Sequence, residues 1–432
     1  MSGVIASALV LAVLALVAVD ALGQSGAPSR TPLAAERIDV TVPAVPINVV
    51  SSFGPDASAA GRPGQLTSSA DGDRTVAAVL ADLQDFWNSR LSAAGGPGLA
   101  PLSGGYWSMD STSPSGSALC IGDPASITGN AFYCAQGDGI VFDSSALVPV
   151  LLGAYGDAGL TAAFAHEFGH AVQAQVGPTL ADRQQHPDRY PSILIEAQAD
   201  CDAGAFLSWA SSGAAQRVHL PKESLVRAVA PLLDFRDPAT VSPADPTAHG
   251  LGLDRLSFLL VGFRNGADAC PEMSTDDLAL TLGHPGVTTS PPSTLPRFPS
   301  TADALAAATS SVTTFTASLD LPAGSATAQP IADPADVALA APLGQFAAGA
   351  AVALAAGRSI AGGNSSANSV LAACFTGAWT ASVFGKVGVD ELGSWPTDAD
   401  EALDLIRSRP GATFDELVGY ADGFHRGWAG CQ

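Results

Sequence analysis

The sequence predicts an α+β fold, mostly helical with a small sheet, followed by a second, helical part. Residues 74–94 repeat apolar positions at helical spacing and end at Gly95-Gly96, which predicts an amphipathic helix. Residues 119–145 alternate β-branched or aromatic residues with turn residues, as short strands near a hairpin do. With 432 residues and 47% apolar content, the chain can fill more than one core.

The N-terminal segment is directed to a membrane. Residues 3–19 form an apolar run closed by Asp20, of a length between a signal-peptide core and a spanning helix. A loop rich in Pro, Ser and Gly follows it, which disfavours the alternative of a buried core helix. We therefore expect residues 1–23 to be a signal peptide or a membrane anchor, and the protein to be extracytoplasmic, in the cell envelope or secreted. The first basic residue is Arg30, so flanking charge does not decide between cleavage and anchoring.

Composition shifts divide the rest of the chain. Residues 24–72 are turn-forming apart from a short β-like stretch at 38–50, and are expected to be a flexible tether. The first folded domain is expected at 73–282. A Pro/Thr/Ser-rich linker at 283–300 separates it from a second domain at 301–432.

The net charge excludes one class of partner. The chain carries 19 basic and 41 acidic side chains, a formal charge of −22. Phosphate backbones require clustered Lys and Arg, so nucleic acid is not expected to bind.

Two histidines bracket a glutamate in the stretch "FAHEFGHAVQ". The surrounding residues 157–177 have helical periodicity, with Asp157 near the start and Gly177-Pro178 as a stop. Positions i and i+4 share one helix face, so His166 and His170 can present two imidazole nitrogens to one cation, with Glu167 beside it. The alternative is a pair of exposed helix histidines that bind nothing.

A catalytic zinc site needs a third protein ligand and an open position for water. The segment 193–210 reads as a second amphipathic helix on which Glu196 and Asp200 share a face. Glu196 suits the third ligand, and Asp200 suits the acceptor for the second ring N–H of a ligating histidine. The pair would otherwise form a solvated acidic face, but its neighbours are apolar. Five other histidines compete with Glu196 for the third position: His186, His219, His249, His284 and His425.

These blocks resemble those of the putative neutral zinc metallopeptidases of bacterial envelopes, which are zincins of the His-His-Glu type. The resemblance runs from "NAFYC" at 130–134 through "AHEFGHAVQ" and "EAQADCDAG" to "HGLGLDRLSFLLVGFRNGADAC" at 249–270. It implies a zincin-like first domain and a Zn²⁺ site of His166, His170 and Glu196, with Glu167 as the base.

The resemblance also draws attention to His249. A donor that hydrogen-bonds the oxyanion of the tetrahedral intermediate assists a zinc peptidase, and His249 is a candidate for it. The structural alternative is a histidine that caps the loop before a helix at 254–265.

Two short sequence blocks of the second domain resemble blocks of the first. "CDAGAF" at 201–206 matches "CFTGAW" at 374–379, and "GFRNGADAC" at 262–270 matches "GFHRGWAGC" at 423–431. Two matched blocks in the same order predict an internal duplication. In the second copy Ser369 and Ala373 replace the two carboxylates, and "FAAGA" at 346–350 replaces the His-Glu block. We therefore expect 301–432 to be a degenerate, metal-free helical repeat.

The cysteines are even in number, as expected for disulfides in an exported chain. Equivalent residues of a duplication should make equivalent bonds. The predicted pairs are Cys201–Cys270, Cys374–Cys431 and, in the strand region, Cys120–Cys134.

The function predicted from these features is that of an exported zinc-dependent endopeptidase, with a zinc-activated water and Glu167 as general base, acting on protein or peptide substrates. The alternative is a non-catalytic zinc-containing envelope scaffold or binding protein. A zinc enzyme acting on a non-peptide amide would use the same site. Glu167 favours an enzyme, because a structural zinc site does not need it. Two further partners are expected: the membrane, through the N-terminal segment, and an envelope protein, through the C-terminal domain.

Overall fold

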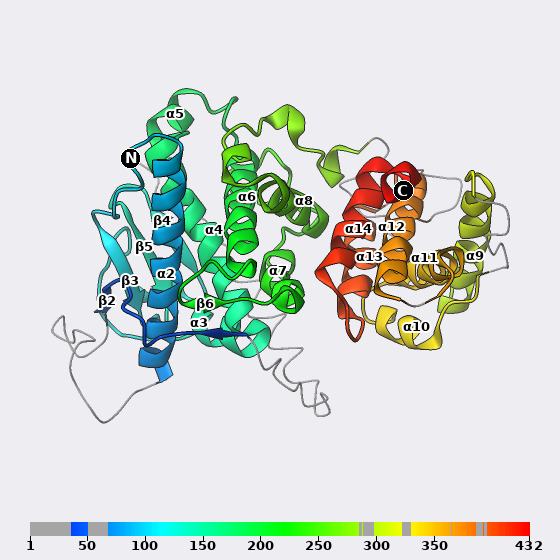
Figure 1. The fold of residues 1–432 in the computed structure, drawn as a ribbon, viewed down its shortest axis with the longest axis horizontal. Coiled ribbons are helices and arrows are strands. Elements are labelled where there is room, and N and C mark those ends of the chain that lie inside the picture. Colours follow the sequence, from blue (N-terminus) through cyan, green and yellow to red (C-terminus); the bar gives the residue numbers. More distant parts are fainter. Residues whose placement is uncertain are drawn as a thin grey trace. The chain divides into compact units, whose positions relative to one another are not determined.

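The described chain forms two compact units (Figure 1). The computed structural model describes residues 36–50, 68–284, 287, 298–321, 330–363, 365–385, 392 and 395–432. The N-terminal unit comprises Met1–Phe235 and Phe258–Thr275, and the C-terminal unit comprises Arg236–Ser257 and Asp276–Gln432. This division differs from the expected domains in that residues 236–257 and 276–282 belong to the C-terminal unit. The apolar run at 3–19 and most of the expected linker lie outside the described residues.

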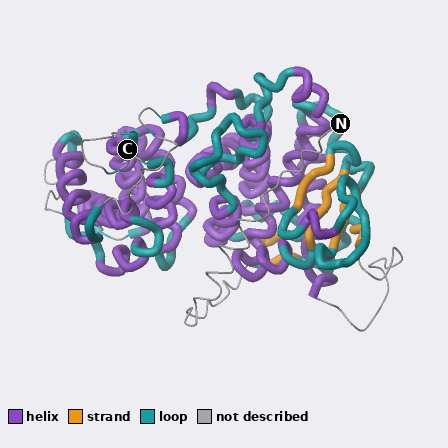
Figure 2. Tube along the Cα trace, turned by 180° about the vertical axis from the view of Figure 1, so that it is seen from behind, coloured by secondary structure: helices purple, strands orange, loops and turns teal. Residues whose placement is uncertain are grey.

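A four-stranded sheet forms one side of the N-terminal unit (Figure 2). Its strand order is β2-β3-β5-β4, from β2 (Ile47–Val50), β3 (Gly105–Met109), β4 (Ala131–Cys134) and β5 (Gly139–Asp143). The β2–β3 and β3–β5 pairs are parallel, and β4–β5 is the antiparallel hairpin predicted in the 119–145 region. Met109, Ile121, Ile127 and Val141 form a buried cluster there.

The first described residues are part of this unit and not of a tether. Strand β1 (Arg37–Ile38) pairs with β6 (Val218–His219), and β2 adds to the main sheet through Ile47 and Tyr106. The expectation of a flexible tether over 24–72 is therefore wrong for residues 36–50, and also for residues 68–72, which begin helix α2. The β-like alternation at 38–50 is satisfied by strand partners more than fifty residues away, which local composition does not reveal.

Helix α4 is the centre of the N-terminal unit. It is contacted by α2, α6, α7, β4 and β5. Its N-terminus continues from α3 and a π-helical turn, so residues 147–176 form one apolar helical stretch. Among the described residues this stretch alone is long and apolar enough to cross a membrane, and 56% of its most apolar window is buried inside the structure. The helices of the unit are α2 (Ser68–Ala93), α3 (Leu147–Val150), the π-helical η2 (Leu151–Tyr155), α4 (Gly156–Val176), α5 (Leu180–Gln185), α6 (Ser192–Ser211) and α7 (Leu225–Asp234), while α8 (Gly252–Asn265) contains a boundary between the units.

Local sequence signals mark the end of helix α4 and the start of helix α6. Helix α4 ends where Gly177 adopts a φ of 96°, which an L side chain rarely tolerates. Helix α6 begins directly after Pro191, whose fixed φ suits the residue before a first helical turn. Between them, Thr179 and Asp182 form a capping box that starts α5. These local signals set the end of α4 and the start of α6, and so determine which residues of the two helices can lie opposite each other.

The helices of the C-terminal unit include α11 (Gln345–Ala361), which contacts α9, α10, α12 and α13. Its small side chains permit close approach, and Phe346 stacks on Trp379 of α12 with ring centroids 5.2 Å apart. The remaining helices are α9 (Thr301–Ala317), α10 (Pro334–Ala340), α12 (Ser366–Val383), α13 (Asp398–Ser408) and α14 (Phe414–Arg426). The long apolar stretch at 343–357 is thus buried within its own unit.

Two helix pairs, one in each unit, have the same close packing. On α6, a Cβ at Gly204 would clash with the carbonyl of Leu259, and on α8 a Cβ at Gly262 would clash with that of Cys201. On α12 and α14 the clashes are between Gly377 and Tyr420, and between Gly423 and Cys374. Disulfides Cys201–Cys270 and Cys374–Cys431 join the two pairs, and Cys120–Cys134 joins the strand region. This is the pairing expected from the matched blocks.

Candidate metal centre

Helices α4 and α6 bring three potential metal ligands together. The side chains of His166, His170 and Glu196 each offer one donor atom, and these atoms lie within 4.8 Å of one another. Glu196 Oε2 is 3.1 Å from Nε2 of His166 and 3.3 Å from Nε2 of His170. The two imidazole planes are nearly perpendicular, with centroids 5.0 Å apart. We call these residues the three-donor cluster.

Each imidazole is oriented through its second nitrogen. Nδ1 of His166 is 2.7 Å from Oδ1 of Asp200, a fully buried carboxylate that can only accept when ionised. Nδ1 of His170 is 3.1 Å from Oε1 of Gln173. Both Nδ1 atoms therefore donate, and both Nε2 atoms face Glu196. A metal-ligating histidine needs this orientation, with Nδ1 donating and Nε2 directed to the metal.

Gln173 is a member of the site that the sequence patterns do not single out. Its Nε2 donates to the backbone carbonyl of Ile195 at 2.8 Å, which fixes the orientation of the amide and leaves Oε1 facing His170. The residue is buried and bridges α4 to α6. The signal that could have found it is its position three residues after His170, on the same helix face.

Charged groups surround the cluster. Burial lowers the pKa of Arg183, on α5, while the charges of Glu196 and Tyr133 act in the opposite direction. Burial raises the pKa of Asp202 well above the usual carboxyl range, a shift that a protonated His166 would oppose. The cluster is thus assembled in a region of low water content, where electrostatic interactions are strong.

Glu167 lies on α4 directly after His166 and is half-buried. His249 lies in the segment 236–257 of the C-terminal unit. There its backbone N–H and that of Gly250 donate to Oδ2 of Asp237, and its Nδ1 is 3.5 Å from Oδ1 of the same carboxylate. Asp237 thereby fixes the loop that carries His249.

The other four histidines have local structural contacts. His186 is exposed and follows the last residue of α5, and His219 pairs with Arg37 between two short strands. In the C-terminal unit, His284 packs against Phe384, and Nε2 of His425 is 2.8 Å from Oγ of Ser257. Within the described ranges, the cluster with metal-ligand geometry contains Glu196 and none of these four.

The donor set fits zinc. Two neutral imidazoles and one carboxylate form a common ligand set of catalytic zinc sites, in which a fourth position stays open. His166 is 5% exposed, and the side chains of His170 and Glu196 are 15% and 12% exposed. The three ligands are therefore mostly buried, and His170 and Glu196 keep a small exposed fraction.

The contact between His166 and Asp200 gives a testable expectation. Asp200→Asn keeps the volume but replaces the anionic acceptor, which weakens the orientation and basicity of the His166 ring. We expect zinc affinity to fall roughly 10- to 100-fold. Competition with a chromogenic chelator measures it, with Asp188→Asn on the exposed loop as the control for loss of one negative charge. Unchanged affinity in Asp200→Asn would show that the 2.7 Å contact does not tune the ligand.

One comparison with known proteins gives a match. The protein-family model described as "Putative neutral zinc metallopeptidase" matches residues 48–272, just over half of the chain. The matched range starts in strand β2 and includes α4, α6 and the whole three-donor cluster. No curated protein and no solved structure matches the chain.

Proposed function

The chain belongs to the neutral zinc metallopeptidase family, and from this premise we propose that it is an endopeptidase that hydrolyses peptide bonds in proteins or peptides. The observation that carries the proposal is the three-donor cluster on α4 and α6, in which both imidazoles present Nε2 toward a shared carboxylate. Zn²⁺ is the cofactor of such a site, held by His166, His170 and Glu196.

Bound zinc supplies Lewis-acid chemistry, which lowers the pKa of water and polarises the scissile carbonyl. The protein supplies the proton transfers. Glu167, one residue after a ligand on the same helix, accepts a proton from the attacking water and then delivers it to the leaving amine. Asp200 and Gln173 hold the two imidazoles in one orientation throughout, because each accepts the Nδ1 proton.

His249 is the proposed donor to the oxyanion of the tetrahedral intermediate. Two observations support this role. The imidazole of His249 can donate a hydrogen bond, and Asp237 holds the loop in place by accepting from two of its backbone N–H groups. The same contacts suit a loop cap, so the reaction class is inferred from the cluster and Glu167, not from His249.

The scaffold alternative explains less of the site. A structural zinc site is normally closed by four protein ligands, whereas this cluster offers three donors and is followed by Glu167. For the C-terminal unit we propose a degenerate, metal-free helical repeat that contacts an envelope partner. The matching glycine packing and disulfides of α6–α8 and α12–α14 support a common origin.

Export to the cell envelope is part of the same proposal. Three disulfides among the described residues are typical of an oxidising compartment, and the apolar run at 3–19 would direct the chain there. The N-terminal sequence of the mature protein distinguishes removal of this segment from its retention as an anchor.

Hydrolysis of a generic unfolded protein by the purified full chain tests the function. We expect cleavage that stops after treatment with a chelator and returns when zinc is added, because zinc supplies the Lewis acid of the reaction. Mass spectrometry of the products identifies internal cleavage sites. A protein that binds zinc but releases no peptide under any of these conditions would support the scaffold alternative.

A further inference from the structure

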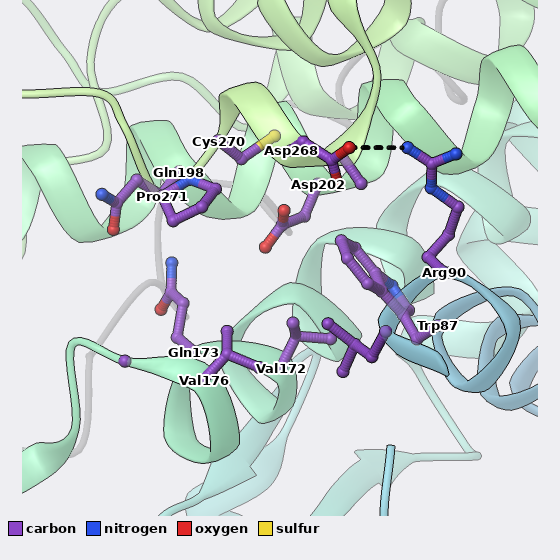
Figure 3. A pocket seen from close by; sticks show the side chains of 13 residues that line it. Trp87, Arg90, Val172, Gln173, Val176, Gln198, Asp202, Asp268, Cys270 and Pro271 are labelled. Carbon is purple, nitrogen blue, oxygen red and sulfur yellow. Dashed lines mark hydrogen bonds and ion pairs between the residues drawn. The ribbon is translucent and has the colours of Figure 1, made fainter. Parts of the chain in front are cut away.

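A pocket of the N-terminal unit lies outside the three-donor cluster (Figure 3). Its cavity volume is about 140 Å³, and its walls come from α2, α4, α6 and the segment 267–271. An engineered protein cavity of about 150 Å³ holds one benzene molecule. A ligand of roughly six non-hydrogen atoms therefore matches this space.

Asp202 contributes a carboxylate to the pocket. The residue is only 4% exposed, and Figure 3 shows its carboxylate directed into the space bounded by Trp87, Val172 and Gln173. Within the described part of the chain, no hydrogen bond or ion pair reaches this carboxylate, and burial is the main influence on its pKa, which it raises. Buried carboxylates are nearly always paired, because removing the charge from water is costly.

Three further polar atoms of the lining have no hydrogen-bond partner among the described residues. They are the acceptor Oε1 of Gln198 and the donors Nε1 of Trp87 and Nε of Arg90, and Gln198 and Trp87 are each 3% exposed. The Gln198 amide is held at its other end, where Nε2 donates to the carbonyl of Met273 at 3.3 Å. The unmatched acceptors of the pocket are therefore a carboxylate and an amide oxygen, which suit a ligand rich in N–H donors.

Among the residues that the structure describes, no Arg or Lys forms an ion pair with Asp202. Arg90 is the basic residue of the lining, and its guanidinium contacts Asp268 at 3.3 Å instead. Both side chains of that pair are solvent-exposed at 40% and 78%, so the pair lies at the rim. Trp87 and the apolar side chains Val172 and Val176 complete the wall, and an indole ring is a favourable neighbour for a cation.

We propose that this pocket binds a small organic cation of the size of a butylammonium ion, with Asp202 as its counter-ion. The ammonium group pairs with the Asp202 carboxylate, and the alkyl part contacts Trp87 and the two valines. The pocket shares Gln173 with the metal centre, since this residue both lines it and accepts the Nδ1 proton of His170. Binding of the cation needs neither zinc nor peptidase activity, so it can be tested independently of the proposed function.

The test is calorimetric titration of the purified full chain with n-butylammonium chloride and, separately, with 1-butanol, its neutral counterpart of equal size. We expect saturable binding of butylammonium and at least about tenfold weaker binding of butanol. Asp202→Asn should weaken butylammonium binding at least about tenfold, because the counter-ion is lost. Asp188→Asn removes one exposed carboxylate instead and should leave the affinity unchanged.

A second variant tests the pocket independently, in case Asp202→Asn fails to fold. Val176 is 48% exposed on the pocket wall, so Val176→Phe should obstruct the entrance without disturbing the core, and should also weaken binding. Equal affinities of wild type and both variants, or equal affinities for butylammonium and butanol, would overturn the proposal. So would a wild type that binds neither probe while Arg90→Gln binds butylammonium, since Arg90 would then be the counter-ion of Asp202 in solution.

Discussion

His170→Ala and Glu196→Ala are each expected to remove most of the zinc from the purified chain. Each variant reduces the three-donor cluster to two protein donors, and two donors rarely hold catalytic zinc. The wild type should contain about one zinc per chain, and either variant well below half of that after extensive dialysis. Elemental analysis by plasma mass spectrometry, normalised to protein concentration, measures the result.

The matched control is His186→Ala. His186 is exposed and follows α5, so its loss removes an imidazole without altering the cluster. This variant should keep the zinc content of the wild type. Circular dichroism separates loss of metal from loss of fold. Full zinc occupancy in both folded cluster variants would mean that other residues hold the metal and that the ligand assignment is wrong.

Glu167→Gln should separate metal binding from turnover. The amide has the shape of the carboxylate but cannot accept a proton from water at neutral pH, so the step that generates the nucleophile loses its base. We expect kcat to fall by roughly 10²- to 10⁴-fold, while the zinc content stays that of the wild type. Initial rates on a fluorogenic peptide, together with elemental analysis of the same sample, give both values.

Glu223→Gln is the control for this substitution, because Glu223 is exposed in the turn before α7 and has the same change of charge. Its rates should match those of the wild type. If Glu167→Gln hydrolysed the peptide at the wild-type rate, Glu167 would not be the base. If instead it lost its zinc, the residue would contribute to metal binding and the assigned division between ligand and base would not hold.

Much of the candidate site follows from helical periodicity. The four-residue spacing of His166 and His170, and of Glu196 and Asp200, places each pair on one helix face whatever packs against that helix. The matched blocks also predict the cysteine pairs, because a repeated helix pair brings equivalent residues together. Local propensity and repeat patterns therefore determine the helices and the residues that can form the cluster.

Three features depend on contacts that local pattern does not encode. Strand β2 is ordered by pairing with β3, whose residues are distant in sequence. Residues 236–257 join the C-terminal unit, although the sequence blocks continue through them. Gln173 becomes the acceptor for His170 because the carbonyl of Ile195, on another helix, fixes its amide.

The two aspartates of α6 show the physical reason. Asp200 and Asp202 lie about 200° apart around the helix axis, so they cannot face the same neighbours. The sequence determines that separation and identifies Asp200 by its spacing from Glu196. Only the packing of α2, α4 and the 267–271 segment around α6 places Asp200 against His166 and leaves Asp202 in a pocket. Periodicity sets which residues of one helix share a face, whereas the environment of each face depends on which other elements pack against it.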